Sequence, residues 1–465
     1  MTAALGSLQF YGGAGTVTGS KYLVKVGQRQ VLLEAGLFQG LKDLRLRNWG
    51  NPPFKVSTLH AVVLSHAHID HSGYAPKLVQ AGFRGKIFCT AGTADLLRVM
   101  LPDAAHLQEE EAAWANKEGF SKHRPALPLY TVEDAQRTLR RMRPCAYDRM
   151  IPVADDLGVV FRRAGHILGS ASVELQLGTA RRFRLVFSGD LGRWNFPVLR
   201  DPEFAPEADA LLLESTYGDR FHPTDPSVTL ARIVNESVKR GGALIIPSFA
   251  VGRTQVIVWL LRHLEDAKKI PALPVYVDSP MAIDVSDIYC RHVEDHDLDI
   301  NDRMTGAGCL LCCRKYHLSR TTEDSKQLNR LEGPAIIIAG SGMATGGRVL
   351  HHLKHRLPDP RTTVLFVGFQ AAGTRGRLLQ EGARFVKMHG QEVRVRATVE
   401  TVDGLSAHAD QREILRWLSG FRKRPKQTYL VHGEPAVAAK LAAVIKSKLG
   451  WKVRPAVDGE TVTLG

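Results

Sequence analysis

The sequence predicts an α/β fold of two domains, one of which contains a mostly parallel sheet flanked by helices. Three observations support this prediction. The chain has 465 residues, more than one hydrophobic core usually organises. Several short apolar runs in the first half end in a histidine or a carboxylate, as strands that deliver side chains to a site do. From about residue 219, short apolar runs alternate with helical stretches, a pattern typical of a parallel sheet covered on both faces.

The composition is that of a globular protein with a strongly basic charge. Hydrophobic residues make up 44% of the chain, and 62 basic against 47 acidic residues give a net charge of +15. This charge favours a polyanionic partner such as nucleic acid, although solubility alone can also account for it. No apolar run is long enough to span a membrane, and the first residues do not resemble a signal peptide. We therefore expect a soluble cytoplasmic protein without a membrane partner.

The chain opens with alternating apolar residues between residues 7 and 40, which predict a hairpin. Glu34 ends its second strand. A carboxylate at this point can hold a metal-bound imidazole in one tautomer, or it can be an ordinary solvated strand end.

The next strand leads into the densest cluster of metal-binding side chains in the sequence. After the apolar run 61–64 come His66, His68, Asp70 and His71 in the pattern H-x-H-x-D-H. Imidazole nitrogen and carboxylate oxygen suit zinc, and this run offers enough ligands for two open sites. A histidine-rich surface loop is the alternative, but an alternating triplet directly behind a buried strand argues against it.

A helix is expected over about 74–81, and residues 107–116 are rich in helix formers and are expected to cap the site region.

Three later strands also end in potential ligands or acids. The strands that follow deliver His166, Asp190 and Glu214 in succession. Asp190 comes after small residues at a strand end, where a carboxylate can bridge two metals. Each residue alone is weak evidence, but the repetition is not expected of a random core.

The second domain is predicted from the apolar runs 241–247, 274–278, 335–339 and 362–367. Between the last two, the glycine-rich stretch 341–348 precedes a helix over 349–356, so its amides can cradle a phosphate. It lacks the lysine of a nucleotide-binding P-loop, which excludes that reading. Cys309, Cys312 and Cys313 are interpreted as reduced thiols in a loop, with a metal or redox site as the minor alternative.

Potential site residues like those of the first half of the chain return near its end, so the second domain is expected to be an insertion. His408 and His432 each lie at a turn or a strand end, and both can close the first site. Individually each is more often structural, but together with the H-x-H-x-D-H run they form a constellation. The basic residues of 394–396 and 422–426 form either a solvated rim or a phosphate-tracking groove. A final edge strand is expected from residue 458.

Taken in order, these motifs resemble those of the metallo-β-lactamase-fold nucleases of the β-CASP family. The resemblance rests on residues 65–71, His166, 188–190, 214–218, 247–255, 341–347, 406–410 and 431–434. It is closest to the compact bacterial and archaeal relatives of the endonuclease subunit that cleaves pre-messenger RNA ends. The resemblance implies an αββα sandwich built from both chain ends, with an inserted β-CASP domain that covers the site as a lid. The expected domains are 1–207 and 389–465 for the sandwich and 208–388 for the insert.

The resemblance also assigns roles to the site residues. Two zinc ions per chain are expected, one held by His66, His68 and His166 and the other by Asp70, His71 and His432, with Asp190 between them. His408, positioned by Glu214, is expected to act as general acid, and Asp70 is counted with the catalytic residues. Ser406 and Ser341 are expected to contact phosphate or RNA. The family usually has aspartate in place of Glu34, so the extra methylene is expected to disturb a supporting hydrogen bond without abolishing function.

The predicted function is a zinc-dependent ribonuclease that cuts single-stranded RNA internally and leaves a 5′-phosphate and a 3′-hydroxyl. RNA is favoured over DNA because the DNA-repair branch of the family carries an aliphatic residue where this chain has His432. The alternatives are a zinc hydrolase of a small thiolester or lactam, a 5′-exoribonuclease, and an RNA-binding scaffold without catalysis. A homodimer is left open.

Overall fold

The computed structural model describes residues 5–119, 121, 123–178, 182–223, 225–296, 311–371 and 373–465. The chain divides into two compact units. Unit 1 comprises residues 1–195, 200–221 and 408–465, and unit 2 comprises residues 196–199 and 222–407. No helix among the described residues is long and apolar enough to cross a membrane.

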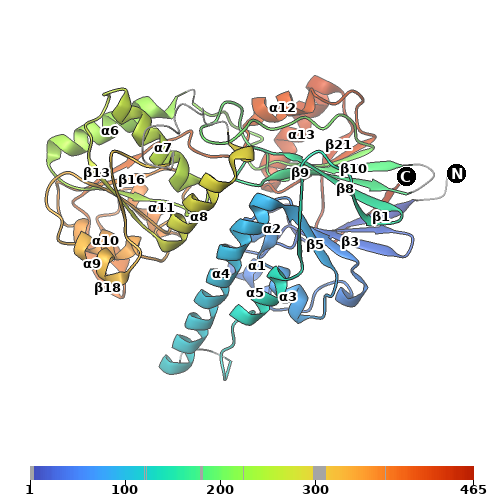
Figure 1. The fold of residues 1–465 in the computed structure, drawn as a ribbon, viewed down its shortest axis with the longest axis horizontal. Coiled ribbons are helices and arrows are strands. Elements are labelled where there is room, and N and C mark those ends of the chain that lie inside the picture. The colour runs from blue at the N-terminus through green and yellow to red at the C-terminus, as the bar shows by residue number, and fades with distance from the viewer. Residues whose placement is uncertain are drawn as a thin grey trace. The chain divides into compact units, whose positions relative to one another are not determined.

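Unit 1 contains two seven-stranded sheets that draw on both ends of the chain (Figure 1). The first sheet has the order β22 (Thr461–Leu464), β1 (Gly6–Phe10), β2 (Tyr22–Val26), β3 (Arg29–Leu33), β4 (Ala61–Val63), β5 (Lys86–Thr90), β6 (Met142–Cys145). The second has the order β21 (Val453–Pro455), β20 (Gln427–Val431), β11 (Ala210–Glu214), β10 (Phe183–Phe187), β9 (Ala171–Leu177), β8 (Leu157–Arg163), β7 (Ile151–Ala154). The last strand pairs antiparallel with the first, so the sheet joins the two ends of the chain.

The two sheets pack face to face over one apolar core. Alternating side chains of both sheets meet there, including Phe10, Tyr22, Phe161 and Phe187, all fully buried. Burial of such aromatic and branched side chains is the main term that stabilises this unit. The predicted sandwich is confirmed.

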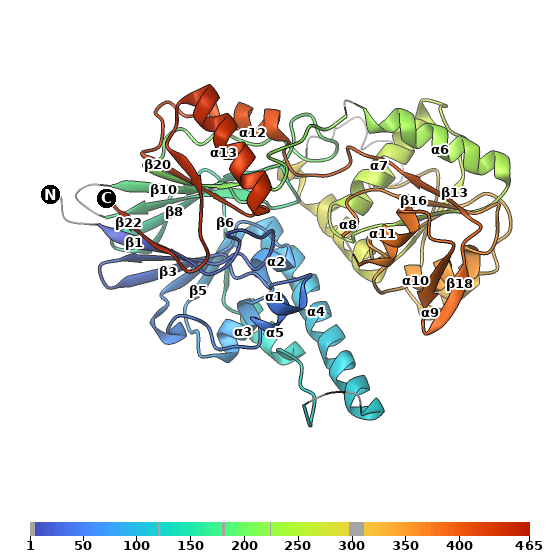
Figure 2. The ribbon, with the colours of Figure 1, turned by 180° about the vertical axis from the view of Figure 1, so that it is seen from behind.

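Helices cover the outer faces of both sheets. On the first sheet lie α2 (Ile69–Ser72), α3 (Ala75–Gln80), α4 (Ala91–Glu118) and α5 (Val132–Leu139), with the short α1 (Lys42–Leu46) and η1 (Val56–Thr58) in the preceding loop. Figure 2 shows α12 (Gln411–Leu418) and α13 (Pro435–Leu449) over the second sheet, where Trp417 and Leu441 are buried against Leu213. The unit is therefore an αββα sandwich.

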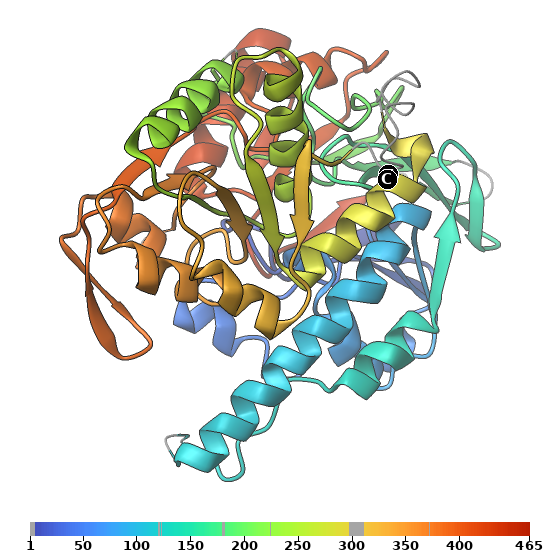
Figure 3. The ribbon, with the colours of Figure 1, turned by 60° about the vertical axis from the view of Figure 1, so that its left-hand side comes forward.

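Helix α4 differs from the expectation that residues 107–116 cap the site. It begins at the N-cap Thr90, continues for 28 residues and extends well beyond the sheet, with Trp114 59% exposed near its far end (Figure 3). Only its first turn lies near the site, where Thr90 Oγ1 and Thr93 Oγ1 both donate to Gly169 O. In the acidic run 109–111, Glu110 and Glu111 are exposed, and Glu109 accepts the backbone N–H of Val132.

Unit 2 is a parallel six-stranded sheet with helices on both faces. Its order is β14 (Lys315–Leu318), β13 (Pro274–Asp278), β15 (Ile336–Ala339), β12 (Leu244–Pro247), β16 (Thr363–Phe366), β19 (Thr398–Thr401). The helices are α6 (Pro226–Arg240), α7 (Arg253–Asp266), α8 (Pro280–Arg291), α9 (Thr322–Leu328), α10 (Val349–Arg356) and α11 (Arg375–Gln380), with η2 (Val293–Asp295) and the hairpin β17 (Phe385–Met388) and β18 (Gln391–Arg394).

The parallel sheet of the second domain and the helix over 349–356 are confirmed. The four apolar runs of the sequence form β12, β13, β15 and β16, and their buried Ile, Val and Leu side chains are typical of strands covered on both faces. Cys312 and Cys313 are free thiols, whereas Cys309 lies outside the described residues. Strand β11 belongs to the second sheet of unit 1, so that unit continues past residue 207.

Candidate metal centre

The side chains predicted from scattered motifs meet at one edge of the sandwich in unit 1. Strands β10, β11 and β20 are neighbours and parallel, with Phe187 opposite Leu212 and Glu214 opposite Val431. Because parallel strands end at the same edge of a sheet, the residues that follow them, Asp190 and His432, lie beside Glu214. Strand β4 ends at the same place in the other sheet, where the loop and α2 carry the H-x-H-x-D-H run.

Three histidines and one carboxylate form a first group of potential ligands. The Nδ1 atom of His68 lies 3.1 Å from His66 Nε2 and 3.2 Å from His166 Nε2. The Oδ2 atom of Asp190 lies 3.5 Å from His66 Nε2 and 3.6 Å from His166 Nε2. These four atoms lie close enough together to hold one metal ion.

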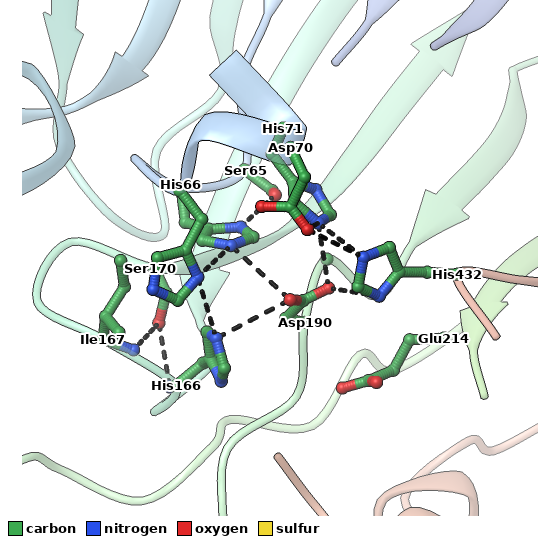
Figure 4. Close-up of polar contacts among 12 residues, drawn as sticks. Ser65, His66, Asp70, His71, His166, Ile167, Ser170, Asp190, Glu214 and His432 are labelled. Atoms are coloured by element: carbon green, nitrogen blue, oxygen red, sulfur yellow. Dashed lines mark hydrogen bonds and ion pairs between the residues drawn. The ribbon is translucent and has the colours of Figure 1, made fainter. Parts of the chain in front are cut away.

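A second group lies on the other side of the same carboxylate. His71 Nε2 and His432 Nε2 are 3.1 Å apart, and Asp70 Oδ2 lies 3.3 Å from His432 Nε2. The Oδ1 atom of Asp190 faces this group, 3.4 Å from His71 Nε2 and 3.3 Å from His432 Nδ1. Figure 4 shows Asp190 between the two groups, with one oxygen toward each.

The donor set fits metal ions better than it fits hydrogen bonds alone. In three close contacts, a ring nitrogen faces another ring nitrogen. A hydrogen bond in each contact requires a proton on one of the two nitrogens, whereas a metal ion binds both nitrogens unprotonated. The buried Asp190 Oδ1 has no hydrogen-bond partner of good geometry among the described residues. Buried polar atoms are normally satisfied, and nitrogen and oxygen ligands in this number suit zinc.

The electrostatics of the pocket agree with that reading. Burial and the neighbouring imidazoles hold the pKa of both His66 and His71 well below the usual value. Burial raises the pKa of Asp190 to about 7. Burial lowers the pKa of His432, but the carboxylates of Asp190 and Asp70 outweigh it and raise that pKa to about 10. Without a cation, protons must therefore balance the buried carboxylates, and a metal ion can replace them.

Glu34 holds the metal loop from behind. Its Oε1 accepts the backbone N–H of Ser65 at 2.6 Å, and its Oε2 contacts Ser65 Oγ at 3.0 Å and His71 Nδ1 at 2.6 Å. Glu34 is fully buried and its backbone has φ 65°. The contact to Nδ1 turns His71 Nε2 toward the site, which is the supporting role expected of this carboxylate.

Glu34→Ala should weaken zinc binding and lower activity by about 10- to 100-fold, because His71 loses the partner that fixes its tautomer and orientation. Zinc affinity can be measured by competition with a chromogenic chelator. Glu174→Gln serves as the control, since Glu174 is also buried but pairs with Arg162 away from the site. Unchanged zinc affinity in Glu34→Ala would contradict the role given to Glu34.

His408 lies beside the first group and contacts a second buried carboxylate. Its Nδ1 is 3.3 Å from Glu214 Oε2 and 3.9 Å from Asp190 Oδ2. Burial lowers the pKa of His408, but the Glu214 carboxylate outweighs it, so the pKa is raised. Because Nδ1 faces Glu214 and the side chain is 20% exposed, the other ring nitrogen can carry a proton toward a substrate.

The structure adds supporting residues that sequence reasoning missed. Ser170 Oγ accepts the N–H groups of His166 and Ile167, and Thr216 Oγ1 contacts His432 Nδ1 at 3.1 Å. The buried Lys21 donates to Gly36 O at 2.6 Å, and Gly36 packs so closely against Asp70 O that a Cβ there would lie 1.7 Å from it. Burial lowers the pKa of Lys21 to about 7. Ser170 comes four residues after its ligand His166, and Thr216 comes two residues after Glu214, whereas nothing near Lys21 signals its role.

Two predicted site residues, Ser341 and Ser406, belong to unit 2. Ser341 Oγ accepts the N–H groups of Thr345 and Gly346, so this hydroxyl stabilises the glycine-rich turn. Its predicted contact with phosphate stays a prediction. Ser406 precedes His408 by two residues and belongs to the same unit as Ser341. Its predicted contact also stays a prediction.

The αββα sandwich with this edge of histidines and carboxylates defines a hydrolase of the metallo-β-lactamase class. Three family models match the chain. A β-lactamase superfamily domain matches residues 29–235, a Beta-Casp domain matches 254–379, and a Zn-dependent metallo-hydrolase RNA specificity domain matches 392–455. The chain belongs to the β-CASP family of zinc-dependent metallo-hydrolases.

Comparison with individual proteins supports the same assignment. The chain is 38% identical to Ribonuclease TTHA0252 of Thermus thermophilus over 97% of this chain and 98% of that protein. It is 31% identical to Transcription termination factor FttA of Methanosarcina mazei, over 97% of this chain and 71% of the factor. A crystal structure of a protein of unknown function from Enterococcus faecalis V583 matches 99% of this chain with TM-score 0.56 and 13% identity, which shows likeness of fold.

Proposed function

We propose that this protein is a zinc-dependent ribonuclease that cuts single-stranded RNA internally and leaves a 5′-phosphate and a 3′-hydroxyl. The observation that carries the proposal is the placement of Asp190 with one carboxylate oxygen toward each of two histidine groups. The match of residues 392–455 to an RNA specificity domain and the net charge of +15 favour RNA over a small neutral substrate. The ribonuclease relative covers nearly the whole chain.

We assign one zinc ion to His66, His68 and His166 and a second to Asp70, His71 and His432, with Asp190 shared. Zinc ions held by these residues would supply an activated water and would neutralise the charge on the phosphate oxygens. The residues hold the ligands in place: Glu34 orients His71, Ser170 orders the His166 loop, and Thr216 contacts His432.

His408 is assigned as the general acid. Hydrolysis of the phosphodiester leaves a ribose 3′-oxygen that must gain a proton, and an imidazole held by a carboxylate can donate one near neutral pH. Glu214 positions His408 through Nδ1 and is itself held by the N–H of Leu191, 2.6 Å from Oε1. Asp70 contributes to catalysis as a ligand of the second zinc ion. Ser341 and Ser406 are proposed to contact the RNA backbone.

A cytoplasmic location and a homodimer remain predictions. The hydrolysis of small thiolesters or lactams is disfavoured, because a large second unit and a strongly basic chain add nothing to the recognition of such substrates.

The proposal is tested by digesting one RNA as a 5′-labelled linear strand and as a closed circle. An internal cutter converts the circle to a linear strand and produces labelled fragments of many lengths. Release of label as mononucleotides, with the circle intact, indicates a 5′-exoribonuclease instead. Zinc-loaded protein that cleaves neither RNA refutes the proposed function, and preferential turnover of a chromogenic lactam would favour the small-substrate alternative.

A further inference from the structure

Unit 2 presents two exposed aromatic side chains at the carboxyl ends of neighbouring parallel strands. Phe249 follows β12 and is 43% exposed, and Phe369 follows β16 and is 59% exposed. Strands β12 and β16 pair directly, so both loops emerge at the same edge of the sheet. Exposing this much aromatic surface is unfavourable in water unless another group covers it.

The position of these loops is one where α/β sheets bind ligands. The chain leaves β12 toward β13 on one side and leaves β15 toward β16 on the other, although β12 and β15 are neighbours. Right-handed crossovers in opposite directions pass over opposite faces of the sheet, and open α/β sheets usually bind ligands at the loops of such a switch point. Phe249 lies in the first of these loops, and the glycine-rich turn from Ser341 forms the second.

The loops are fixed to one another by several contacts. A Cβ on Gly342 would lie 2.8 Å from Phe249 Cδ2, so the Phe249 ring lies directly against the glycine-rich turn. Gln370 Nε2 donates to Gly342 O at 3.0 Å, which ties the residue after Phe369 to the same turn. Thr254 Oγ1 donates to Phe249 O at 2.8 Å. The loops that carry Phe249 and Phe369 are therefore both attached to the glycine-rich turn at Gly342.

A positive charge lies at the same turn. Arg375 Nη1 donates to Thr345 O at 3.1 Å, and its Nε donates to Lys387 O at 2.7 Å. Among the described residues, Arg375 makes no ion pair, so its charge is not neutralised by a carboxylate. A guanidinium held by carbonyl groups at the turn that Phe249 contacts suits a ligand that is both anionic and aromatic.

We propose that Phe249 and Phe369 stack against two bases of a single-stranded RNA and that Arg375 contacts the phosphate backbone between or beside them. The proposal deepens the proposed ribonuclease function and rests on it. Stacking on an aromatic ring is tolerant of base identity, because every base has a π-face, so this surface selects single strands and not a sequence. A duplex, whose bases are already stacked on each other, cannot use it.

The first test compares substitutions that separate stacking from apolar contact. Binding of a labelled 12-nucleotide RNA is measured in a His408→Ala background, which prevents cleavage. Phe249→Ala and Phe369→Ala should each raise the Kd by about 5- to 150-fold. Phe369→Trp should retain the affinity of phenylalanine, whereas Phe369→Leu should lose it. Phe385→Ala is the control, because Phe385 is 52% exposed in the same unit but lies on the hairpin.

A second test removes the partner from the RNA instead of from the protein. RNAs with a single abasic position are scanned along the 12-nucleotide strand. Loss of the base at one position should weaken binding to the parent protein and have no further effect on binding to the Phe369→Ala variant. Loss of the base at a different position should behave in the same way with the Phe249→Ala variant. Coupling of this kind is expected only where ring and base are in contact.

The outcomes separate the two proposals. Turnover of bis(p-nitrophenyl) phosphate, which contains no RNA strand, should be unchanged in otherwise wild-type protein carrying Phe249→Ala or Phe369→Ala. If the wild type cleaves RNA and both alanine variants bind RNA as tightly as their parent, the stacking inference is wrong and the proposed function stands. If leucine serves as well as tryptophan, the surface is an apolar docking site for a protein partner. If the wild type does not cleave RNA, the proposed function fails first.

Discussion

Replacing His408 with alanine should reduce RNA cleavage by about 10²- to 10⁴-fold, the usual contribution of a positioned general acid. The zinc content should not change, because His408 contacts Glu214 and approaches Asp190 no closer than 3.9 Å. Cleavage is measured on a labelled RNA, and zinc is measured by elemental analysis of the purified variant.

The leaving group offers a sharper readout of the same role. A p-nitrophenolate leaving group departs without a proton, so His408→Ala should affect the hydrolysis of bis(p-nitrophenyl) phosphate far less than the cleavage of RNA. Glu214→Gln should resemble His408→Ala in milder form, since it removes the charge that holds the imidazole. Equal losses on both substrates would show that His408 supports the site structure and does not donate the proton.

Asp190→Asn should remove metal from both ligand groups and reduce activity by more than the roughly 10- to 100-fold that follows the loss of a supporting partner. The reason is geometric: each carboxylate oxygen faces a different group, and an amide nitrogen in place of one oxygen cannot bind a cation. Elemental analysis should find less than one zinc ion per chain.

The control for this variant is Asp134→Asn. Asp134 is 3% exposed in the same unit, but it forms the capping box of α5 with Thr131. Its replacement should cost about 0.5–2 kcal/mol of stability without loss of zinc. If Asp190→Asn retains two zinc ions, the bridging position is wrong.

The sequence predicts the strands and their end residues well because local patterns determine them. The apolar run before His66 and the small residues before Asp190 mark strand ends that the structure confirms. The order of the strands is a different matter. That β20 pairs with β11, 217 residues earlier in the chain, depends on packing of side chains far apart in sequence, and no local signal encodes it. The meeting of His432 and His71 was therefore available from the family resemblance and not from periodicity.

The contacts of the supporting residues could not be predicted from the sequence. Glu34 could be named as a candidate partner of an imidazole, but which imidazole and through which nitrogen depended on the pairing of β3 with β4. The expectation that residues 107–116 cap the site failed because helix propensity gives length and not direction: α4 leaves the site after its first turn. Lys21 reads as an ordinary strand residue, since burial of a lysine against carbonyl oxygens has no sequence signature.

The central claim is that distant segments of the chain enclose two zinc ions that share Asp190. Anomalous X-ray scattering from a crystal of the zinc-loaded protein, measured at the zinc edge, tests it most directly. We expect two peaks about 3.5–4 Å apart, one among His66, His68 and His166 and the other among Asp70, His71 and His432. A single peak, or peaks that leave Asp190 without contact to either ion, would contradict it.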